Sequence, residues 1–230
     1  MSRRDELAAG LAETEQRIRD ACAAAGRSRD EITLVVVTKT HPASDVEILA
    51  ELGVVDVGEN RHPEAGDKAD EVSAQLHWHF LGGLQTNKAG AVARYADVVH
   101  SVDRVKLVGS LSRGAEAAGR TVTCLVQVDF DATDPGRAGV VPDGIGDVAD
   151  AIATAPGLEL GGLMTVAPLG DDPASHFAHL ARLSAELRQR HPAATIISAG
   201  MSGDFEAAIA AGATHLRIGR SVLGERPSSG

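Results

Sequence analysis

The residue with the clearest chemical potential is Lys39, which stands directly after a short apolar run and shortly before Pro42. The run 34–37 has three β-branched residues and predicts a buried strand, and Pro42 marks where the next element begins. A lysine at such a strand end is partly removed from water, which lowers its pKa and exposes a neutral amine. A neutral amine can form a Schiff base with a carbonyl compound. The alternative is a lysine that extends into solvent.

The elements that must position this lysine follow a regular alternation. Short β-rich runs indicate eight strands, at 32–37, 55–57, 78–81, 98–101, 122–128, 158–164, 195–198 and 215–218. Ala-rich stretches between them predict helices, at 43–52, 87–95, 103–118, 174–190 and 203–211. An amphipathic helix is expected before the first strand, over residues 3–24.

Strict β/α alternation implies parallel strands with right-handed crossovers. We therefore expect one (β/α)8 TIM-type barrel domain over residues 1–230, with an extra N-terminal helix. A doubly wound open sheet is the alternative. It would usually have fewer strands, and no G-x-G-x-x-G follows the first predicted strand.

Polar residues in the last two loops predict an anion site at the mouth of this barrel. Barrels of this kind often bind phosphate between the loops after strands 7 and 8, where glycines and helix N-termini present backbone N–H groups. The residues concerned are Ser198, Gly200, Met201 and Ser202 in one loop, and Gly219, Arg220 and Ser221 in the other. Ordinary Gly/Ser turns are the alternative.

An amine and a phosphate cradle at one barrel mouth together suggest a specific cofactor. Pyridoxal 5′-phosphate (PLP) has an aldehyde on one side of its ring and a phosphate on an arm at the other. The predicted position of Lys39 and the predicted anion site would serve these two groups.

The chain also resembles the pyridoxal phosphate homeostasis proteins, single-domain relatives of the alanine racemase barrel. The shared motifs are VVVTKTHP around Lys39, GEN at 58–60, WHFLGGLQTNK at 78–88, HSVDR at 100–104, GLM at 162–164 and SAGMSGDFEAAIAAGATHLRIGR at 198–220. The resemblance implies a Schiff base between PLP and Lys39, and phosphate contacts from the last two loops. It also implies that Arg217 lies near the pyridine nitrogen and Asn60 near the ring.

Composition narrows the possible partners. The net charge of −10 argues against a nucleic-acid partner, and no apolar run is long enough for a signal peptide or a membrane span. Cys22 and Cys124 form no paired framework, so we expect reduced thiols in a cytoplasmic protein. Apo-forms of PLP enzymes are expected recipients of the cofactor, and the chain is expected to be a monomer or weak dimer.

Three functions remain open from the sequence. The first is a non-enzymatic PLP carrier, and the second is a PLP-dependent enzyme related to amino-acid racemases. Against the second, the chain ends soon after the eighth strand, and its only tyrosine, Tyr95, is expected on the outer helices, away from the mouth. The third is a metal hydrolase, because His77 and His79 lie on one face of a strand, although no further ligands follow and His79 is expected inside the barrel.

Overall fold

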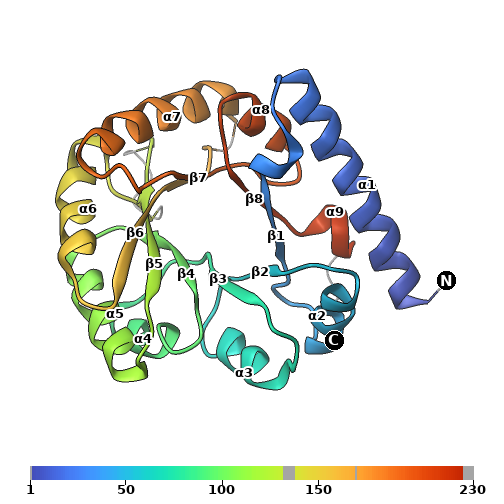
Figure 1. The fold of residues 1–230 in the computed structure, drawn as a ribbon, viewed down its shortest axis with the longest axis horizontal. Coiled ribbons are helices and arrows are strands. Elements are labelled where there is room, and N and C mark those ends of the chain that lie inside the picture. The colour runs from blue at the N-terminus through green and yellow to red at the C-terminus, as the bar shows by residue number, and fades with distance from the viewer. Residues whose placement is uncertain (1, 132–137, 169, 225–230) are drawn as a thin grey trace.

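Eight parallel strands close into a barrel in the computed structural model, which describes residues 2–131, 138–168 and 170–224 (Figure 1). Each strand pairs with the next along the chain, and the eighth pairs with the first. The predicted fold is therefore confirmed, and the open sheet is wrong. The strands are β1 (Thr33–Val37), β2 (Asp56–Glu59), β3 (His77–Phe80), β4 (Val98–Val102), β5 (Val122–Val128), β6 (Leu158–Thr165), β7 (Ile196–Ser198) and β8 (His215–Ile218).

Helices surround this barrel and connect successive strands (Figure 1). They are α1 (Arg3–Ala24), α2 (Ala43–Glu51), α3 (Glu64–Glu71), α4 (Thr86–Val92), α5 (Val105–Ala118), α6 (Ile145–Thr154), α7 (Pro173–Arg190), α8 (Phe205–Ala210) and α9 (Arg220–Leu223). Single 3-10 turns lie at Arg29–Glu31 and Pro142–Gly144. The sequence analysis did not place α3 and α6.

The core between strands and helices is built almost entirely from aliphatic side chains. Val36, Val57, Val99 and Leu163 are fully buried, each from a different strand. Aromatic residues make up only 3% of the sequence, so many small contacts replace a few large ones. Burial of these branched residues on both faces is what parallel strands under a layer of helices require.

The extra helix α1 covers the wall of the barrel next to α8, α9 and α2 (Figure 1). Leu7, Ile18 and Cys22 are buried along one side of it, which agrees with the amphipathic helix expected over residues 3–24. Arg3 ties its first turn to the fold, because its guanidinium donates to the carboxylate of Asp45 (2.7 Å) and to the carbonyl of Leu223 (3.1 Å). Helix α9, which follows β8, has only one turn and covers little of this wall, so α1 covers the rest.

Two boundaries differ from the sequence prediction in ways that bear on function. The second strand extends to Glu59, whose carboxylate is buried and paired with Lys68 of α3, a partner that local sequence does not show. Helix α4 ends at Val92, so Tyr95 lies in the turn that follows rather than in the helix. No helix within the described ranges is long and apolar enough to cross a lipid bilayer.

Candidate functional site

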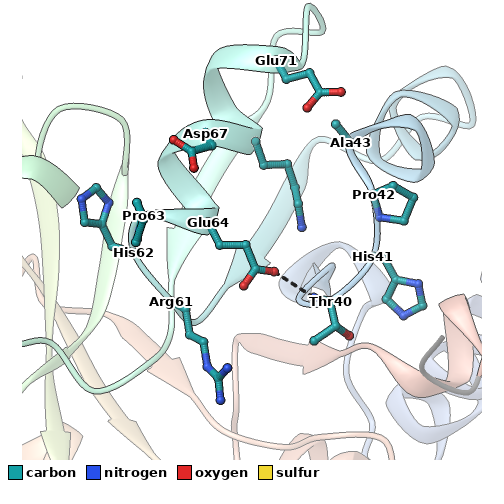
Figure 2. Close-up of a pocket in the computed structure, with 11 residues that line it drawn as sticks. Thr40, His41, Pro42, Ala43, Arg61, His62, Pro63, Glu64, Asp67 and Glu71 are labelled. Carbon is teal, nitrogen blue, oxygen red and sulfur yellow. Dashed lines mark hydrogen bonds between the residues drawn. The ribbon is translucent and has the colours of Figure 1, made fainter. Parts of the chain in front are cut away.

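Lys39 lies two residues beyond β1, at the end of the barrel where the strands finish, and is half-buried. The next residue, Thr40, has a positive φ of 69°, which is rare and strained for a β-branched residue. Its N–H donates to a carboxylate oxygen of Glu64 (3.3 Å; Figure 2). The surrounding structure thus holds the chain in a costly conformation directly after the lysine, as is often seen where a side chain must be aimed.

A second lysine lies close to this strand end, which the sequence analysis did not anticipate. Lys68 of α3 is buried, and its ammonium donates to Glu59 (2.5 Å) and to the carbonyl of Thr38 (3.0 Å). The hydroxyl of Thr38 also donates to Glu59 (2.7 Å). Burial raises the pKa of Glu59, and the hydrogen bonds from Lys68 and Thr38 oppose that rise. The ammonium of Lys68 is therefore committed to Glu59 and to Thr38, the residue directly before Lys39.

Arg217 joins the ends of three strands from inside the barrel. It is 5% exposed and projects from β8. Its guanidinium donates to the hydroxyl of Ser198 at the end of β7 (2.6 Å) and to the carbonyl of Thr165 at the end of β6 (2.7 Å). Burial lowers the pKa of Arg217 to about 10, so the side chain still carries its charge at neutral pH.

The loops after β7 and β8 present backbone donors, as an anion site needs. Within the described part of the chain, the N–H groups of Ser202, Gly203, Arg220 and Ser221 have no protein acceptor. Gly200, at φ 92°, bends the first of these loops, and a Cβ there would lie 2.7 Å from that of Ala208. Such a set of unpaired N–H groups is a favourable place for phosphate oxygens.

The remaining predicted site residues of these two loops differ in their burial and in their contacts. The Ser198 hydroxyl is fully buried and faces Arg217, so it is unavailable as a surface donor. The N–H of Met201 is used by Asp204 (2.6 Å), and its side chain is partly exposed. Gly219 passes so close to β1 that a Cβ would lie 2.9 Å from the carbonyl of Val37. The side chain of Arg220 is exposed.

Asn60 follows β2 and is held by the neighbouring loop. A Cβ on Gly82 would lie 2.0 Å from the carbonyl oxygen of Asn60, so only glycine allows this approach. The contact fixes the loop after β3 against the loop after β2. The side chain of Asn60 is half-buried.

An open cleft of about 930 Å³ lies beside this end of β1 and β2 (Figure 2). It is bounded by the start of α2 and by α3, and its walls carry charges of both signs, from Arg61, Lys68, Glu64, Asp67 and Glu71. Thr40 and Arg61 lie at one end of the cleft, directly after Lys39 and Asn60 in the chain.

The histidines proposed as metal ligands are engaged with protein groups. His77 Nδ1 and His79 Nε2 lie 3.1 Å and 3.0 Å from the same carboxylate oxygen of Asp56, so the two side chains do share a face. His79 is buried inside the barrel, as expected, whereas His77 is exposed at the opposite end from Lys39. Among the described residues, no group of three or more His, Cys, Asp or Glu could hold a metal ion.

Comparison with known proteins places this arrangement in a family. Residues 11–227 match the family described as alanine racemase, N-terminal domain. A pyridoxal phosphate homeostasis protein of Mycobacterium tuberculosis is 39% identical, over 97% of this chain and 94% of its own length. The protein of that name from Escherichia coli is 34% identical over 98% and 99%. The chain belongs to the pyridoxal phosphate homeostasis protein family.

Solved structures agree with this family assignment. PipY of Synechococcus elongatus, 33% identical, superposes without PLP at a TM-score of 0.84, over 95% of this chain and all of that one. A second PipY structure, with PLP bound, superposes at a TM-score of 0.79, over 90% of this chain and all of that one. An alanine racemase of Clostridium difficile is 16% identical and superposes with a TM-score of 0.74, over 98% of this chain and 58% of the racemase chain. At this identity the likeness shows a shared fold alone.

Several residues that shape the site of this family member were not found from the sequence. Lys68 carries no local signal, because its burial depends on the packing of α3 against β2. Gly203 was quoted within a motif but not named as a donor. His100 was also part of a motif, yet only the closed barrel brings it to Ser198, 98 positions later.

Proposed function

We propose that this chain binds pyridoxal 5′-phosphate and acts as a non-enzymatic, cytoplasmic carrier that takes part in PLP homeostasis. Lys39 would hold the cofactor as a Schiff base, and the loops after β7 and β8 would hold its phosphate. Support comes from relatives named for PLP homeostasis and from a PipY structure that contains PLP.

The observation that carries the proposal is the pairing of two features at one end of the barrel. The first is an amine at the end of β1 followed by a strained residue. The second is the set of four unpaired backbone N–H groups at Ser202, Gly203, Arg220 and Ser221. PLP supplies an aldehyde for an amine and a dianionic phosphate for such donors. The residues present therefore fit the cofactor.

Arg217 gives partial support for a carrier, since racemases of the related fold also tolerate such an arginine. We place its guanidinium beside the pyridine nitrogen of PLP and Asn60 beside the ring. An arginine that keeps its proton disfavours protonation of that nitrogen, so the ring becomes a weaker electron sink. The chemistry of most PLP enzymes depends on that sink.

The position of Tyr95 supports the same conclusion. Its ring stacks on His62 with centroids 6.0 Å apart, and a Cβ on Gly66 would lie 3.3 Å from its edge. Burial raises the pKa of its hydroxyl above the ordinary value. Tyr95 is the only tyrosine of the sequence, and in this environment it is a poor acid or base for two-base racemisation.

The experiment is to add PLP to the purified protein, reduce the complex with borohydride and map the modified peptide by mass spectrometry. The adduct is expected on Lys39 and should be absent from Lys39→Ala. Lys68→Met is the matched control, because Lys68 is a buried lysine near the same strand end. An adduct that persists in Lys39→Ala and disappears in Lys68→Met would overturn the assignment.

We further propose that apo-forms of PLP enzymes receive the cofactor from this chain. The half-buried position of Lys39 favours such exchange, because a cofactor held at an open barrel end can leave without a large conformational change. The expected monomer or weak dimer would leave the barrel mouth accessible to a recipient.

A further inference from the structure

A continuous row of side-chain hydrogen bonds crosses the interior of the barrel from β2 to β8. Asp56 Oδ1 lies 3.0 Å from His79 Nε2, and His79 Nδ1 lies 2.9 Å from His100 Nε2. His100 Nδ1 lies 2.9 Å from Ser198 Oγ, which accepts from Arg217 at 2.6 Å. The row begins near the exposed His77 and ends at the cofactor end of the barrel.

This row occupies space that barrels of this class usually fill with aliphatic side chains. His100 and Ser198 have no exposed surface, and His79 retains only 2%. Burying polar groups in this way costs free energy that paired hydrogen bonds only partly recover. A fully connected row therefore calls for a role beyond filling the barrel.

The two end groups set the direction in which the bonds are donated. A guanidinium only donates, and an ionised carboxylate only accepts. His79 therefore carries hydrogen on Nε2, toward Asp56, and with a neutral ring its Nδ1 accepts from His100. Ser198 then donates to His100 and accepts from Arg217. With both rings neutral, every bond in the row is donated away from Arg217 and toward Asp56.

The surroundings of His100 favour its neutral form. Burial lowers the pKa of His100 well below its usual value, and the nearby His79, Arg217 and His215 lower it further. His215 also faces His79, with ring centroids 6.2 Å apart. Burial opposes ionisation of Asp56, but its hydrogen bonds with His79 and His77 lower its pKa overall. The ends of the row are thus charged, and His100 between them is neutral.

We propose that His79 and His100 are positioning residues of the cofactor site, which act through Ser198 to hold the guanidinium of Arg217 in place for the ring nitrogen of PLP, with Asp56 as the terminal acceptor. The inference rests on the proposed function. The row fixes the rotamer of Ser198, because its one hydrogen is committed to His100 and its oxygen faces Arg217. Neither histidine needs to touch the cofactor.

The test compares two ligands that differ only at the ring nitrogen. The probes are PLP and its 1-deaza analogue, in which carbon replaces that nitrogen, and their dissociation constants are measured by absorbance titration. The parent is expected to bind PLP about tenfold more tightly, the size of one hydrogen bond from a charged donor. In His100→Phe, the dissociation constant of PLP should rise to that of the analogue, whereas the dissociation constant of the analogue should not change.

Two further variants make the result decisive. Asp56→Ala removes the far end of the row, four hydrogen bonds from Arg217, and should raise the dissociation constant of PLP as His100→Phe does. His215→Asn is the matched control, since this half-buried histidine bonds Thr214 (3.0 Å) and makes no hydrogen bond to the described residues of the row. If His100→Phe does not fold, as judged by circular dichroism, Asp56→Ala decides the question.

The outcomes separate this inference from the function on which it rests. Equal weakening of both ligands in the row variants would indicate a general structural role and overturn the inference. Unchanged binding of both ligands would overturn it as well. Failure of the parent protein to bind PLP at all would instead overturn the proposed function. Loss of discrimination between the two ligands in the row variants alone supports the positioning role.

Discussion

The guanidinium of Arg217 donates to the buried hydroxyl of Ser198 across 2.6 Å, and so links the ends of β8 and β7 below the proposed phosphate loops. The same guanidinium donates to the carbonyl of Thr165 on β6. One side chain therefore sets the spacing of three strand ends. The geometry of the barrel end depends on this contact before any cofactor is bound.

Replacing Arg217 should consequently weaken the fold as well as the site. In Arg217→Met, the acceptors on Ser198 and Thr165 lose a charged donor inside the barrel. We expect the free energy of unfolding of the apo-protein to fall by about 2 kcal/mol, measured by urea denaturation. Arg220→Met is the control, because that side chain is exposed and should change stability by less than about 0.5 kcal/mol. Equal stabilities for the two variants would contradict the linking role.

The phosphate group should supply much of the affinity for PLP. Backbone N–H groups of Ser202, Gly203, Arg220 and Ser221 are available to it, and charge-assisted bonds of this kind contribute about 1.5–3 kcal/mol each. Pyridoxal without phosphate should therefore bind at least roughly a hundredfold more weakly. Titrations of both compounds provide the measurement. Similar dissociation constants would mean that these loops are not a phosphate cradle.

Thr40 offers a test of whether strain serves the site. Glycine adopts a φ of 69° without penalty, so Thr40→Gly relieves about 1 kcal/mol of strain while it loosens the chain beside Lys39. We expect unchanged or higher stability of the apo-protein together with weaker PLP binding. Thermal unfolding and PLP titration measure the two effects. If PLP binds the variant as tightly as the parent, the strained conformation has no part in aiming Lys39.

The fold and the ends of the site could be predicted from sequence because their signals are local. The run before Lys39, the glycines of the last two loops and the β/α rhythm each lie within a few residues. β5 and β8 were located to the residue at Val122–Val128 and His215–Ile218, since their ends coincide with changes of polarity.

The interior of the site could not be predicted, because it depends on packing between elements and on closure of the barrel. Burial of a charged residue such as Glu59 at the end of β2 is unexpected from the local sequence, and it is explained by the ion pair with Lys68 of α3. Ser198 has the composition of a phosphate loop, yet its hydroxyl turns inward because His100 and Arg217 meet it there. Contacts between positions about 100 residues apart leave no trace in local pattern.

Stability should decline on acidification because of the buried histidines. Burial, reinforced by the nearby His79, lowers the pKa of His215 from 6.5 to about 4. The unfolded chain then binds more protons between pH 6.5 and 4, so stability is complete above that window and falls as the pH drops through it. A shift of this size corresponds to roughly 3 kcal/mol. Urea unfolding across this range should show a smaller loss in His215→Asn, and an identical pH dependence would count against the assignment.

The loaded protein should not turn over amino acids. In its proposed place beside the pyridine nitrogen, Arg217 would disfavour a protonated ring, and the buried hydroxyl of Tyr95 has a raised pKa and packs against His62. Two-base racemisation needs a second proton carrier opposite Lys39, and the only tyrosine of the sequence is not placed to supply it. Incubation with L- and D-amino acids should give racemisation, transamination and decarboxylation no faster than free PLP does.

A parallel assay tests the carrier role directly. Apo-forms of PLP enzymes are mixed with the loaded protein, and recovery of their activity reports transfer of the cofactor. Lys39→Ala is the control in both assays, because it removes the covalent attachment. Transfer without turnover supports a carrier. Turnover above the rate of free PLP that disappears in Lys39→Ala would instead establish an enzyme, since only a reaction on the bound cofactor would depend on that amine.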